Sequence, residues 1–490
     1  MDLSSAVPGA ETAPRGAGAG ADVDVRRIVH DSRHVAAGDL FVAIRGAKSD
    51  GLAHVPEALA RGAAAVVSQE APLPGVAVPW VRVPDARRAL ALLAARLAGD
   101  PAENLVLVGV TGTNGKTTTA TLLQALLARR YGGAGFLGTV GYRIGRREIP
   151  ADRTTPDAVL LQELLAELVR EGVPAASMEV SSHALSLARV EGCRFDLAVF
   201  TNLTRDHLDF HRDMEDYFEA KARLFELRKP GAAAVVNVAD PFGRRLAART
   251  PGRVVTYAAV EVEGGADVTA ASVRCDLSGT SFEAMSPAGR FEVKSPLLGR
   301  FNVDNLLAAA SGGLALGMPP GEIAAALASV RRVPGRLEPV EAGQSYRILV
   351  DYAHTEDALA RLLAAVRELT DKKIILVFGC GGDRDRGKRE PMGRLAGSLA
   401  HIAIATSDNP RTEDPEKILD EVERGLIISG ATKYLRLADR REAIRAAIDL
   451  ANPGTVVVIA GKGHETTQVI GDREEPFDDR AIAAELAASR

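Results

Sequence analysis

The segment GVTGTNGKTTTATLL, residues 109–123, combines closely spaced glycines with a lysine and a run of threonines. Its first glycine lies six residues before Gly115, whereas the Walker A pattern needs five. Backbone N–H groups of such a loop, together with the following helix N-terminus, bind anionic phosphates. We therefore expect Lys116 to neutralise the β- and γ-phosphates of ATP and Thr117 to offer a hydroxyl to Mg²⁺. The alternative is a glycine turn that caps a helix, but a strand predicted at 105–110 favours the phosphate loop.

Carboxylates and histidines follow two further predicted strands, at 175–180 and 196–201. The first strand leads into MEVSSHAL, which contains Glu179, and the second into TNLTRDHLDFH, which contains His207. Chemistry in open α/β sheets collects beyond the carboxyl ends of the strands, and a carboxylate with an imidazole beside phosphates suits Mg²⁺. Either segment alone is more simply an acidic loop in water. Two such loops after consecutive strands favour a metal site.

These loops need a sheet to position them, and the sequence predicts one, because short β-type runs alternate with Ala- and Leu-rich helical patterns. The predicted strands are 105–110, 175–180, 196–201, 233–238, 346–351, 373–379, 401–406 and 455–461. The predicted helices are 117–130, 157–171, 215–228, 303–316, 355–369 and 440–451. The fold class is therefore α/β with parallel sheets. Polar and apolar residues alternate over 250–295, which suggests an antiparallel insert.

A chain of 490 residues is too long for one core and should form several domains. The first 24 residues are rich in Ala, Gly and Pro, which predicts a disordered tail at 1–24. Pro- and Gly-containing stretches before two strands predict domains at 25–100, 101–337 and 338–490. The net charge of −4 gives no basic field for nucleic acid. Three cysteines without paired spacing fit a reducing cytosol. Without a signal-peptide pattern or an apolar run of about 18 residues, we expect a cytoplasmic protein with no membrane insertion.

A glycine cluster at 379–382 invites a dinucleotide-binding interpretation. It fails the GxGxxG test, because Arg384 stands where the third glycine belongs. We therefore expect no dinucleotide cofactor at this loop.

The displaced glycine is informative, because TGTNGKTT is the form of the phosphate loop found in the Mur ligase superfamily, which includes folylpolyglutamate synthases. The resemblance extends over nearly the whole chain, through FNVDN (301–305), PGR (334–336) and VDYAHTEDAL (350–359). It implies a small N-terminal α/β uridine-binding domain, a central P-loop parallel-sheet ATPase domain and a C-terminal Rossmann-like domain. Glu356 replaces a helix-starting proline of the family, which alters a cap more than a contact. The ATP-binding residues that the resemblance implies are Gly112, Thr113, Asn114, Gly115, Lys116, Thr117, Thr118, Asn302, Arg336, Asp351 and His354.

The segment YFEAKARLFEL, residues 217–227, contains a lysine whose role comes only from the resemblance. On sequence alone Lys221 is a solvated helix lysine. In Mur ligases the lysine at this place is carbamylated by CO₂, and the resulting anion helps to hold Mg²⁺. Carbamylation requires the neutral amine and hence a lowered pKa. The implied metal ligands are Thr117, Glu179, His207 and carbamylated Lys221, and the implied catalytic residues are Lys116, Glu179, His207 and Lys221.

Three stretches are similar to the sugar-nucleotide site of one branch of the family. HDSRHVAAGDLFVAIRGAKSDG (30–51) is similar to its uridine-binding domain, and TTPD (154–157) and SSHALSLAR (181–189) are similar to its muramoyl-dipeptide contacts. Leu187 stands where a relative has a polar residue, so one contact differs. The residues implied for UDP-N-acetylmuramoyl-L-alanyl-D-glutamate (UDP-MurNAc-L-Ala-D-Glu) are His30, Ser32, Thr154, Thr155, Ser181 and Arg189.

The tetrapeptide DNPR within SDNPRTEDP (407–415) resembles the form that selects meso-diaminopimelate as the incoming amino acid. Diaminopimelate ends in a second amino-acid centre, with a carboxylate that lysine lacks. Arg389 and Arg411 can grip a carboxylate through bidentate hydrogen bonds, and Glu465 can take an ammonium. Asn-Pro also favours a plain turn, and a turn can present the arginine. The implied residues are Arg389, Asp408, Asn409, Pro410, Arg411, Gly461 and Glu465.

The resemblance therefore predicts an ATP-dependent amide ligase that adds meso-diaminopimelate to the D-Glu γ-carboxylate of UDP-MurNAc-L-Ala-D-Glu through an acyl phosphate. We expect a monomer that uses Mg²⁺ and small-molecule substrates in peptidoglycan precursor synthesis. One alternative is a related ligase that adds L-lysine or extends folates. Another is a P-loop switch or motor that binds ATP without joining anything. A catalytically inactive binding scaffold is disfavoured by the intact lysine, carboxylates and arginines.

Overall fold

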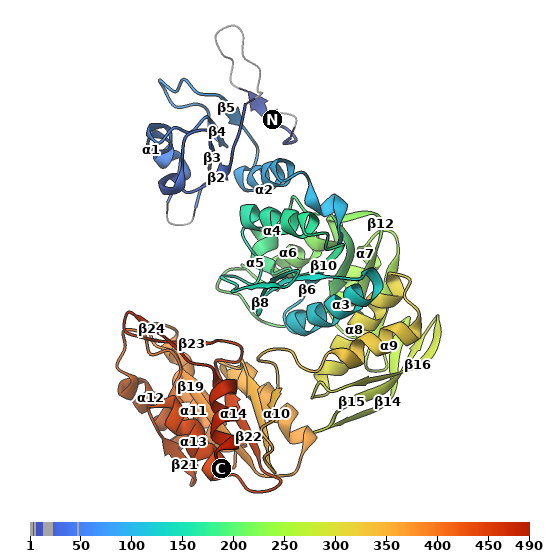
Figure 1. Ribbon diagram of the computed structural model, residues 1–490, viewed down its shortest axis with the longest axis vertical. Helices are drawn as coiled ribbons and strands as arrows, with labels where there is room; N and C mark the ends of the chain where they lie inside the picture. The colour runs from blue at the N-terminus through green and yellow to red at the C-terminus, as the bar shows by residue number, and fades with distance from the viewer. Residues whose placement is uncertain (1–2, 4–5, 13–22, 47–48) are drawn as a thin grey trace. The chain divides into compact units, whose positions relative to one another are not determined.

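The computed structural model (Figure 1) describes residues 3, 6–12, 23–46 and 49–490. The chain divides into two compact units. Unit 1 spans Met1–Thr269, Ala284–Phe291 and Asn305–Ala326, and unit 2 spans Ala270–Glu283, Glu292–Asp304 and Leu327–Arg490. The described residues form sheets of five, eleven, six and two strands. The predicted α/β class is confirmed.

The first sheet of unit 1 has the order β1-β5-β4-β3-β2 and is parallel except at β1. Its elements are β1 (Glu11–Thr12), β2 (Ile28–Val29), β3 (Leu40–Ala43), α1 (Val55–Ala60), β4 (Ala65–Ser68), β5 (Trp80–Arg82) and α2 (Ala86–Leu97). Here the structure differs from the disordered tail expected at 1–24, because Leu3 and Val7 are buried in the core of this sheet. The Gly and Pro content of the segment predicted disorder and gave no sign that Leu3 and Val7 would be buried. The prediction for residues 1–2, 4–5 and 13–22 lies outside the described residues.

The phosphate-loop strand β6 lies inside an eleven-stranded sheet with the order β16-β15-β14-β13-β12-β11-β6-β10-β7-β8-β9. Strands β7, β10, β6, β11, β12 and β13 run parallel, and the edge strands β8 and β9 run antiparallel. The strands are β6 (Val106–Thr111), β7 (Gly135–Gly138), β8 (Gly141–Ile144), β9 (Arg147–Ile149), β10 (Ala175–Glu179), β11 (Phe195–Phe200), β12 (Arg228–Asn237), β13 (Val254–Ala258), β14 (Val268–Asp276), β15 (Gly279–Ser286) and β16 (Gly289–Ser295). The segment predicted as an antiparallel insert thus extends one edge of this sheet, and β14 pairs with β13 in parallel.

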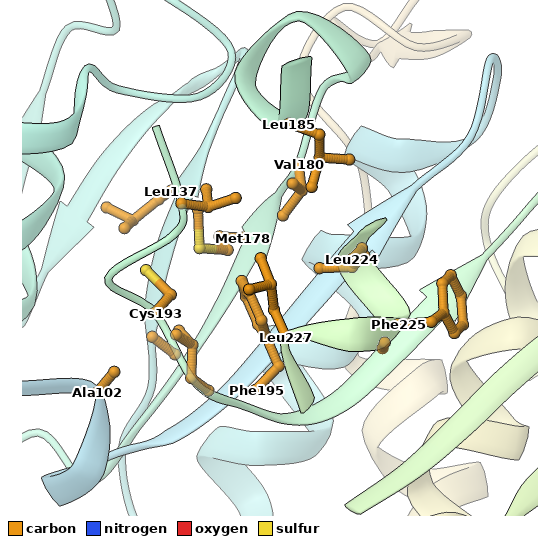
Figure 2. Packing of buried hydrophobic residues seen from close by; sticks show 14 of the residues in the cluster. Ala102, Leu137, Met178, Val180, Leu185, Cys193, Phe195, Leu224, Phe225 and Leu227 are labelled. Atoms are coloured by element: carbon orange, nitrogen blue, oxygen red, sulfur yellow. The ribbon is translucent and has the colours of Figure 1, made fainter. Parts of the chain in front are cut away.

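Helices cover the sheet because its central strands are apolar on both faces. The helices of this part of the chain are α3 (Lys116–Tyr131), α4 (Ala158–Arg170), α5 (Ser182–Ser186), α6 (Met214–Glu226), α7 (Pro241–Arg249), α8 (Phe301–Ala315) and α9 (Pro320–Ser329). Figure 2 shows part of this core, where Met178 of β10, Phe195 of β11 and Leu224 of α6 belong to one buried cluster. The same cluster explains the displaced glycine of the phosphate-loop motif. A Cβ on Gly109 would lie 2.8 Å from the Phe195 ring and 3.0 Å from Leu224, so this glycine serves core packing.

Unit 2 contains a six-stranded sheet with the order β17-β18-β22-β19-β20-β21, parallel except at β17. Its strands are β17 (Glu338–Val340), β18 (Arg347–Asp351), β19 (Ile374–Cys380), β20 (Ile402–Ser407), β21 (Tyr434–Arg436) and β22 (Val456–Ala460). Its helices are α10 (Glu356–Leu369), α11 (Arg389–Leu399), α12 (Pro415–Ile428), α13 (Arg440–Asp449) and α14 (Asp479–Ala488). A separate hairpin joins β23 (Thr467–Ile470) to β24 (Arg473–Pro476).

Every predicted strand and helix is present, with ends that shift by a few residues. The departure at Glu356 lies at the N-terminus of a helix. Helix α10 begins at Glu356, and the Thr355 side chain accepts a hydrogen bond from the Ala358 N–H at its N-terminus. An acidic residue in the first turn also interacts favourably with the helix dipole.

Candidate active site

The phosphate loop, residues 112–115, joins the carboxyl end of β6 to α3 and has room only for glycine at two positions. Gly112 has φ +150°, and a Cβ there would lie 1.8 Å from Thr201 Oγ1. Gly115 has φ +84°, and a Cβ there would lie 2.3 Å from Asn305 Oδ1. Side chains at either position would therefore distort the loop that the anion needs.

The loop is held in shape by bonds to the neighbouring strand and by its own lysine. Thr113 N–H donates to the Asn202 carbonyl at 2.8 Å, and Thr201 Oγ1 donates to the Asn114 carbonyl at 2.6 Å. Lys116 Nζ donates to the Gly112 and Thr113 carbonyls, both at 2.9 Å. The ammonium therefore lies against the loop whose N–H groups are expected to receive phosphate.

Glu179, at the end of β10, is a buried carboxylate directly beside the first turn of α3. Thr117 Oγ1 donates to its Oε2 at 2.9 Å, and Thr139 donates its N–H to Oε1 at 2.8 Å. Gly138 leaves the space for this carboxylate, since a Cβ there would lie 2.4 Å from Oε1. Sequence reasoning missed Thr139 and Gly138, which come from the neighbouring strand. The hydroxyl and carboxylate oxygens of Thr117 and Glu179 are ligand types that Mg²⁺ prefers, so this pair fits the predicted metal.

Lys221 lies on the inner face of α6 and is only 1% exposed, so the solvated lysine indicated by the sequence alone is wrong. Its Nζ donates to the Gly112 carbonyl at 2.8 Å and lies 4.5 Å from the Tyr217 ring centroid. Burial, with the charge of nearby Lys116, holds the pKa of Lys221 well below its usual range. The apolar stripe of α6 was the available signal, because Tyr217, Lys221 and Phe225 recur at helical spacing. The structure thus places an amine of lowered pKa against the phosphate loop.

His207 lies in an exposed loop with φ +53° and belongs to an aromatic cluster. Its ring centroid lies 4.9 Å from that of His183 and 6.0 Å from that of Tyr217. Partial desolvation lowers the pKa of His207, and the charges of Lys116 and Lys221 lower it further, although Asp206 opposes them. The imidazole is therefore favoured in the neutral form that can ligate a metal.

Among the described residues, no three His, Cys, Asp or Glu side chains gather as a metal-binding group. The predicted ligand set contains only two such residues, with a hydroxyl and a modified lysine for the rest. The four predicted ligands come from the first turn of α3, the end of β10, the loop after β11 and α6.

The residues predicted for the muramoyl dipeptide adjoin Glu179. Thr155 Oγ1 donates to the Glu179 carbonyl at 2.9 Å and accepts from the Ser181 N–H at 3.0 Å. Arg189 Nη1 donates to the Thr155 carbonyl at 3.2 Å, and Thr154 Oγ1 lies 3.0 Å from Thr139 Oγ1. The structure therefore brings four predicted residues together. The other two residues predicted for the sugar nucleotide, His30 and Ser32, lie in the region of the five-stranded sheet. There His30 is exposed, and Ser32 Oγ donates to Glu57 Oε2 at 2.7 Å.

In unit 2 the PGR turn packs against the end of β18. The Arg336 guanidinium lies 5.5 Å from the Tyr352 ring centroid, and Asp351 accepts a hydrogen bond from the Leu337 N–H at 2.8 Å. Burial raises the pKa of Asp351, although the nearby Arg336 lowers it. His354 Nδ1 lies 2.8 Å from the Tyr352 carbonyl oxygen. These three predicted ATP residues are neighbours, and buried Asn302 donates from α8 to the Leu298 carbonyl at 2.7 Å.

Arg389, at the start of α11, is fully buried and already holds two carboxylates. Its Nη2 donates to Glu413 Oε1 at 2.9 Å, and its Nη1 donates to Glu421 Oε2 at 3.1 Å. Only its Nε is a buried nitrogen without a partner. Contact between Arg389 and a substrate carboxylate stays a prediction. In this structure the Arg389 side chain, which belongs to α11, bonds to the loop that contains DNPR and to α12.

That ion pair predicts an acid-sensitive contribution to stability. The Arg389 hydrogen bonds lower the pKa of Glu413 from its usual value to about 2. Because the folded-state pKa is the lower one, the stabilisation is present above the unfolded pKa of about 4.3 and is lost as the pH falls towards 2. We expect Glu413→Gln to unfold at a lower urea concentration than the unchanged chain at pH 7, with a gap that narrows below about pH 4.3. A gap that stays constant from pH 7 to pH 3.5 would contradict this assignment.

The DNPR segment follows β20 and lies beside the hairpin strand β23. Arg411, with φ +52°, donates its N–H to the Val469 carbonyl at 3.0 Å and its Nη1 to the Gly382 carbonyl at 2.8 Å. Asn409 Nδ2 donates to Glu465 Oε2 at 3.1 Å. Gly461 has φ +119°, and a Cβ there would lie 3.3 Å from Asp408 Oδ2. The predicted diaminopimelate residues, with Pro410 between Asn409 and Arg411, therefore form one loop cluster at the carboxyl ends of β20 and β22.

Comparison with known proteins accounts for this arrangement along the whole chain. Three family models match in succession: "Mur ligase family, catalytic domain" at 24–97, "Mur ligase middle domain" at 110–312 and "Mur ligase, glutamate ligase domain" at 335–463. The chain belongs to the Mur ligase family.

Individual family members agree with this assignment. The chain is 46% identical to the UDP-N-acetylmuramoyl-L-alanyl-D-glutamate–2,6-diaminopimelate ligases of Geobacter metallireducens and Geobacillus kaustophilus, with 96% of each chain covered in both cases. A solved structure of a ligase of the same name is 36% identical, with a TM-score of 0.71 and 95% of both chains covered. The MurF ligase of Thermotoga maritima, solved in complex with ADP, is 22% identical with a TM-score of 0.59 and 96% and 97% of the two chains covered, and it supports the family fold alone.

None of the helices formed by the described residues combines the length and the apolar composition that a membrane span needs. The three-domain Mur ligase fold predicted from the motifs is confirmed. The exact domain boundaries and the individual site residues stay predictions.

Proposed function

We propose that this chain is the ATP-dependent ligase that joins meso-2,6-diaminopimelate to the γ-carboxylate of D-Glu in UDP-MurNAc-L-Ala-D-Glu. The observation that carries this proposal is the 46% identity, over 96% of both chains, to a ligase named for that pair of substrates. The reaction is a step of peptidoglycan precursor synthesis. We place it in the cytoplasm, on a monomer that requires no membrane or nucleic-acid partner.

The donor carboxylate must first become an electrophile, because a carboxylate at neutral pH resists attack by an amine. Its oxygen attacks the γ-phosphorus of ATP, and the bond from that phosphorus to the β-phosphate oxygen breaks. The products are ADP and an acyl phosphate. The phosphate-loop N–H groups and Lys116 stabilise the negative charge on the transferring phosphoryl group. The adjacency of Thr154, Thr155, Ser181 and Arg189 to Glu179 supports a donor site beside that loop.

Thr117, Glu179, His207 and carbamylated Lys221 are the residues that would hold Mg²⁺, which when bound neutralises phosphate charge. The burial and the lowered pKa of the Lys221 amine support the modification, in which the neutral nitrogen adds to CO₂ and releases one proton to give an anionic carbamate. In the structure the Lys221 amine donates to the Gly112 carbonyl, and the Lys116 charge lowers its pKa although Asp206 opposes this.

The residues that we assign to the amino-acid acceptor lie in unit 2. The unprotonated amine of one diaminopimelate centre attacks the acyl carbon. The tetrahedral adduct then collapses with release of phosphate, which takes up the proton that the nitrogen loses. Arg411 is the cation available for the distal carboxylate, and Glu465 is the anion available for the distal ammonium. A positive and a negative group together suit a zwitterionic amino-acid centre.

The direct test is a phosphate-release assay with ATP, Mg²⁺, UDP-MurNAc-L-Ala-D-Glu and a panel of amino acids. We expect release with meso-diaminopimelate to exceed release with L-lysine or L-glutamate roughly 10- to 100-fold in kcat/KM, since an unmade charged contact costs about 1.5–3 kcal/mol. Comparable release with L-lysine would assign a different acceptor. ATP hydrolysis that ignores the sugar nucleotide would instead favour a P-loop switch or motor.

Removal of the Arg411 guanidinium tests the acceptor site. Arg411→Ala should raise the KM for diaminopimelate roughly 10- to 100-fold, because a charge-assisted contact to the distal carboxylate is lost. The KM for ATP should change by less than about twofold, and exposed Arg424→Ala on α12 is the matched control. Equal increases in both KM values would show that Arg411 does not select the amino acid.

A further inference from the structure

The side chain of Lys462, between two glycines after β22, has no exposed surface although it is a lysine. Its Nζ donates to Glu465 Oε2 at 3.0 Å and to Asn409 Oδ1 at 3.1 Å, and it lies 3.9 Å from Asp408 Oδ1. Asn409 Nδ2 in turn donates to the same Glu465 oxygen at 3.1 Å. Three side chains from two loops therefore form a closed cycle of hydrogen bonds.

Lys462 also fixes which way the Asn409 amide faces. Asn409 Oδ1 receives hydrogen bonds from Lys462 Nζ and, at 3.0 Å, from the Val469 N–H, and neither of these groups can accept. The amide nitrogen must then face Glu465. Buried networks in which each member is satisfied hold their side chains in one arrangement.

The cycle leaves one part of Glu465 for a ligand. Both side-chain hydrogen bonds that Glu465 makes with described residues go to Oε2, while the side chain keeps 33% of its surface exposed. Two loop connections fix the backbone around it, because Glu465 N–H donates to the Lys462 carbonyl at 2.9 Å and Gln468 Nε2 donates to the Asp408 carbonyl at 2.7 Å. The second carboxylate oxygen, Oε1, is thus held at a set position.

A buried ion pair between Arg440 and Asp479 stabilises the start of the same two loops. Arg440 donates to the Ser407 carbonyl at 3.2 Å and to the Ala460 carbonyl at 3.0 Å, which are the last residues of β20 and β22. Asp479 receives two hydrogen bonds from the same guanidinium, at 2.6 and 2.7 Å. Arg440 and Asp479 cancel in formal charge, so the cycle in front of them, with Asp408, keeps a net charge of one negative unit.

We propose that Lys462 is a positioning residue that directs one oxygen of Glu465 towards the distal ammonium of the amino-acid substrate, and so sets the preference for a zwitterionic distal centre. The single negative charge of the cluster matches one incoming ammonium, while Arg411 is left for the carboxylate. This inference rests on the proposed function, because it deepens the diaminopimelate site.

The test compares two substrates that differ only in the distal ammonium: meso-diaminopimelate and 2-aminopimelate, which keeps the distal carboxylate. Lys462→Met keeps an unbranched chain but removes the charge and the donors. We expect the KM for meso-diaminopimelate to rise roughly 10- to 100-fold and its kcat/KM advantage over 2-aminopimelate to fall by a similar factor. The KM values for ATP and UDP-MurNAc-L-Ala-D-Glu should change less than about twofold, as should all values for exposed Lys433→Met.

Equal losses with both amino acids would assign Lys462 a merely structural role and overturn the proposal, as would an unchanged preference. Should Lys462→Met fail to fold, Glu465→Gln gives the decisive result, because this partly exposed side chain carries the proposed contact. Glu465→Gln that keeps the full preference for meso-diaminopimelate would also overturn the proposal. If the unchanged chain ligates neither amino acid, the proposed function itself fails, which is a different outcome from loss of preference in the variants.

Discussion

Replacing Lys116 by alanine should lower the rate of ATP-dependent ligation by at least about 1,000-fold, the scale of a cation that stabilises phosphoryl transfer. The Lys116 ammonium lies 2.9 Å from two carbonyl oxygens of the phosphate loop, beside the N–H groups that would bind the phosphates. Lys221 cannot substitute for it, because Lys221 donates to the Gly112 carbonyl from a buried site where its pKa is lowered. Phosphate release under saturating substrates measures the effect.

The control for this variant is Lys433→Ala, an exposed lysine before β21. Thermal unfolding of Lys116→Ala should stay within about 3 °C of the unchanged chain, because the lost contacts are two partly buried hydrogen bonds of about 1 kcal/mol each. Ligation within about tenfold of the unchanged rate would refute the phosphate role of Lys116.

The fold and the phosphate site could be predicted because both depend on local patterns. A buried strand, a glycine loop and an amphipathic helix determine where Lys116 lies, whatever else the chain does. The role of Gly109 could not be predicted, because it depends on Phe195 and Leu224, which approach from distant parts of the sequence. The displaced glycine of the motif, Gly109, is therefore required by a contact in the core. Gly112 is the first glycine that the conformation of the phosphate loop requires.

The amino-acid site shows the same limit more strongly. The DNPR motif predicts Asn409 and Arg411 for the proposed amino-acid site but gives no signal for Lys462, because a lysine between two glycines is ordinarily solvated. Its burial arises from tertiary packing: a Cβ on the next residue, Gly463, would lie 2.7 Å from Tyr352 Cβ. The partners of Arg389 could not be predicted for a related reason. Glu413 and Glu421 are distant from Arg389 in sequence, and each alone is a plausible surface acid.

The second large effect concerns Lys221. Lys221→Ala should lower ligation roughly 100- to 1,000-fold, as expected when one preorganised charge near the transferring phosphoryl group is lost. Short carboxylates such as formate or acetate should restore part of the activity, because the truncated side chain leaves space in which a small anion can replace the carbamate. Lys221→Arg is the matched control, since a guanidinium neither reacts with CO₂ at neutral pH nor leaves that space, and it should not be rescued.

The modification itself is open to a direct measurement, because the structure favours the reactive form of the amine. With the pKa of Lys221 lowered by burial and by the Lys116 charge, the neutral amine is more abundant near pH 7 than for an exposed lysine, and protonation would place two cations beside one loop. Carbon-13-labelled bicarbonate should therefore give a carbamate resonance in the unchanged chain that is absent from Lys221→Ala. The signal should weaken as the pH falls, since acid removes both the free amine and the carbamate. Normal ligation by an unchanged chain without that resonance would mean that an unmodified, buried lysine suffices, and the anionic ligand would then have to come from another side chain.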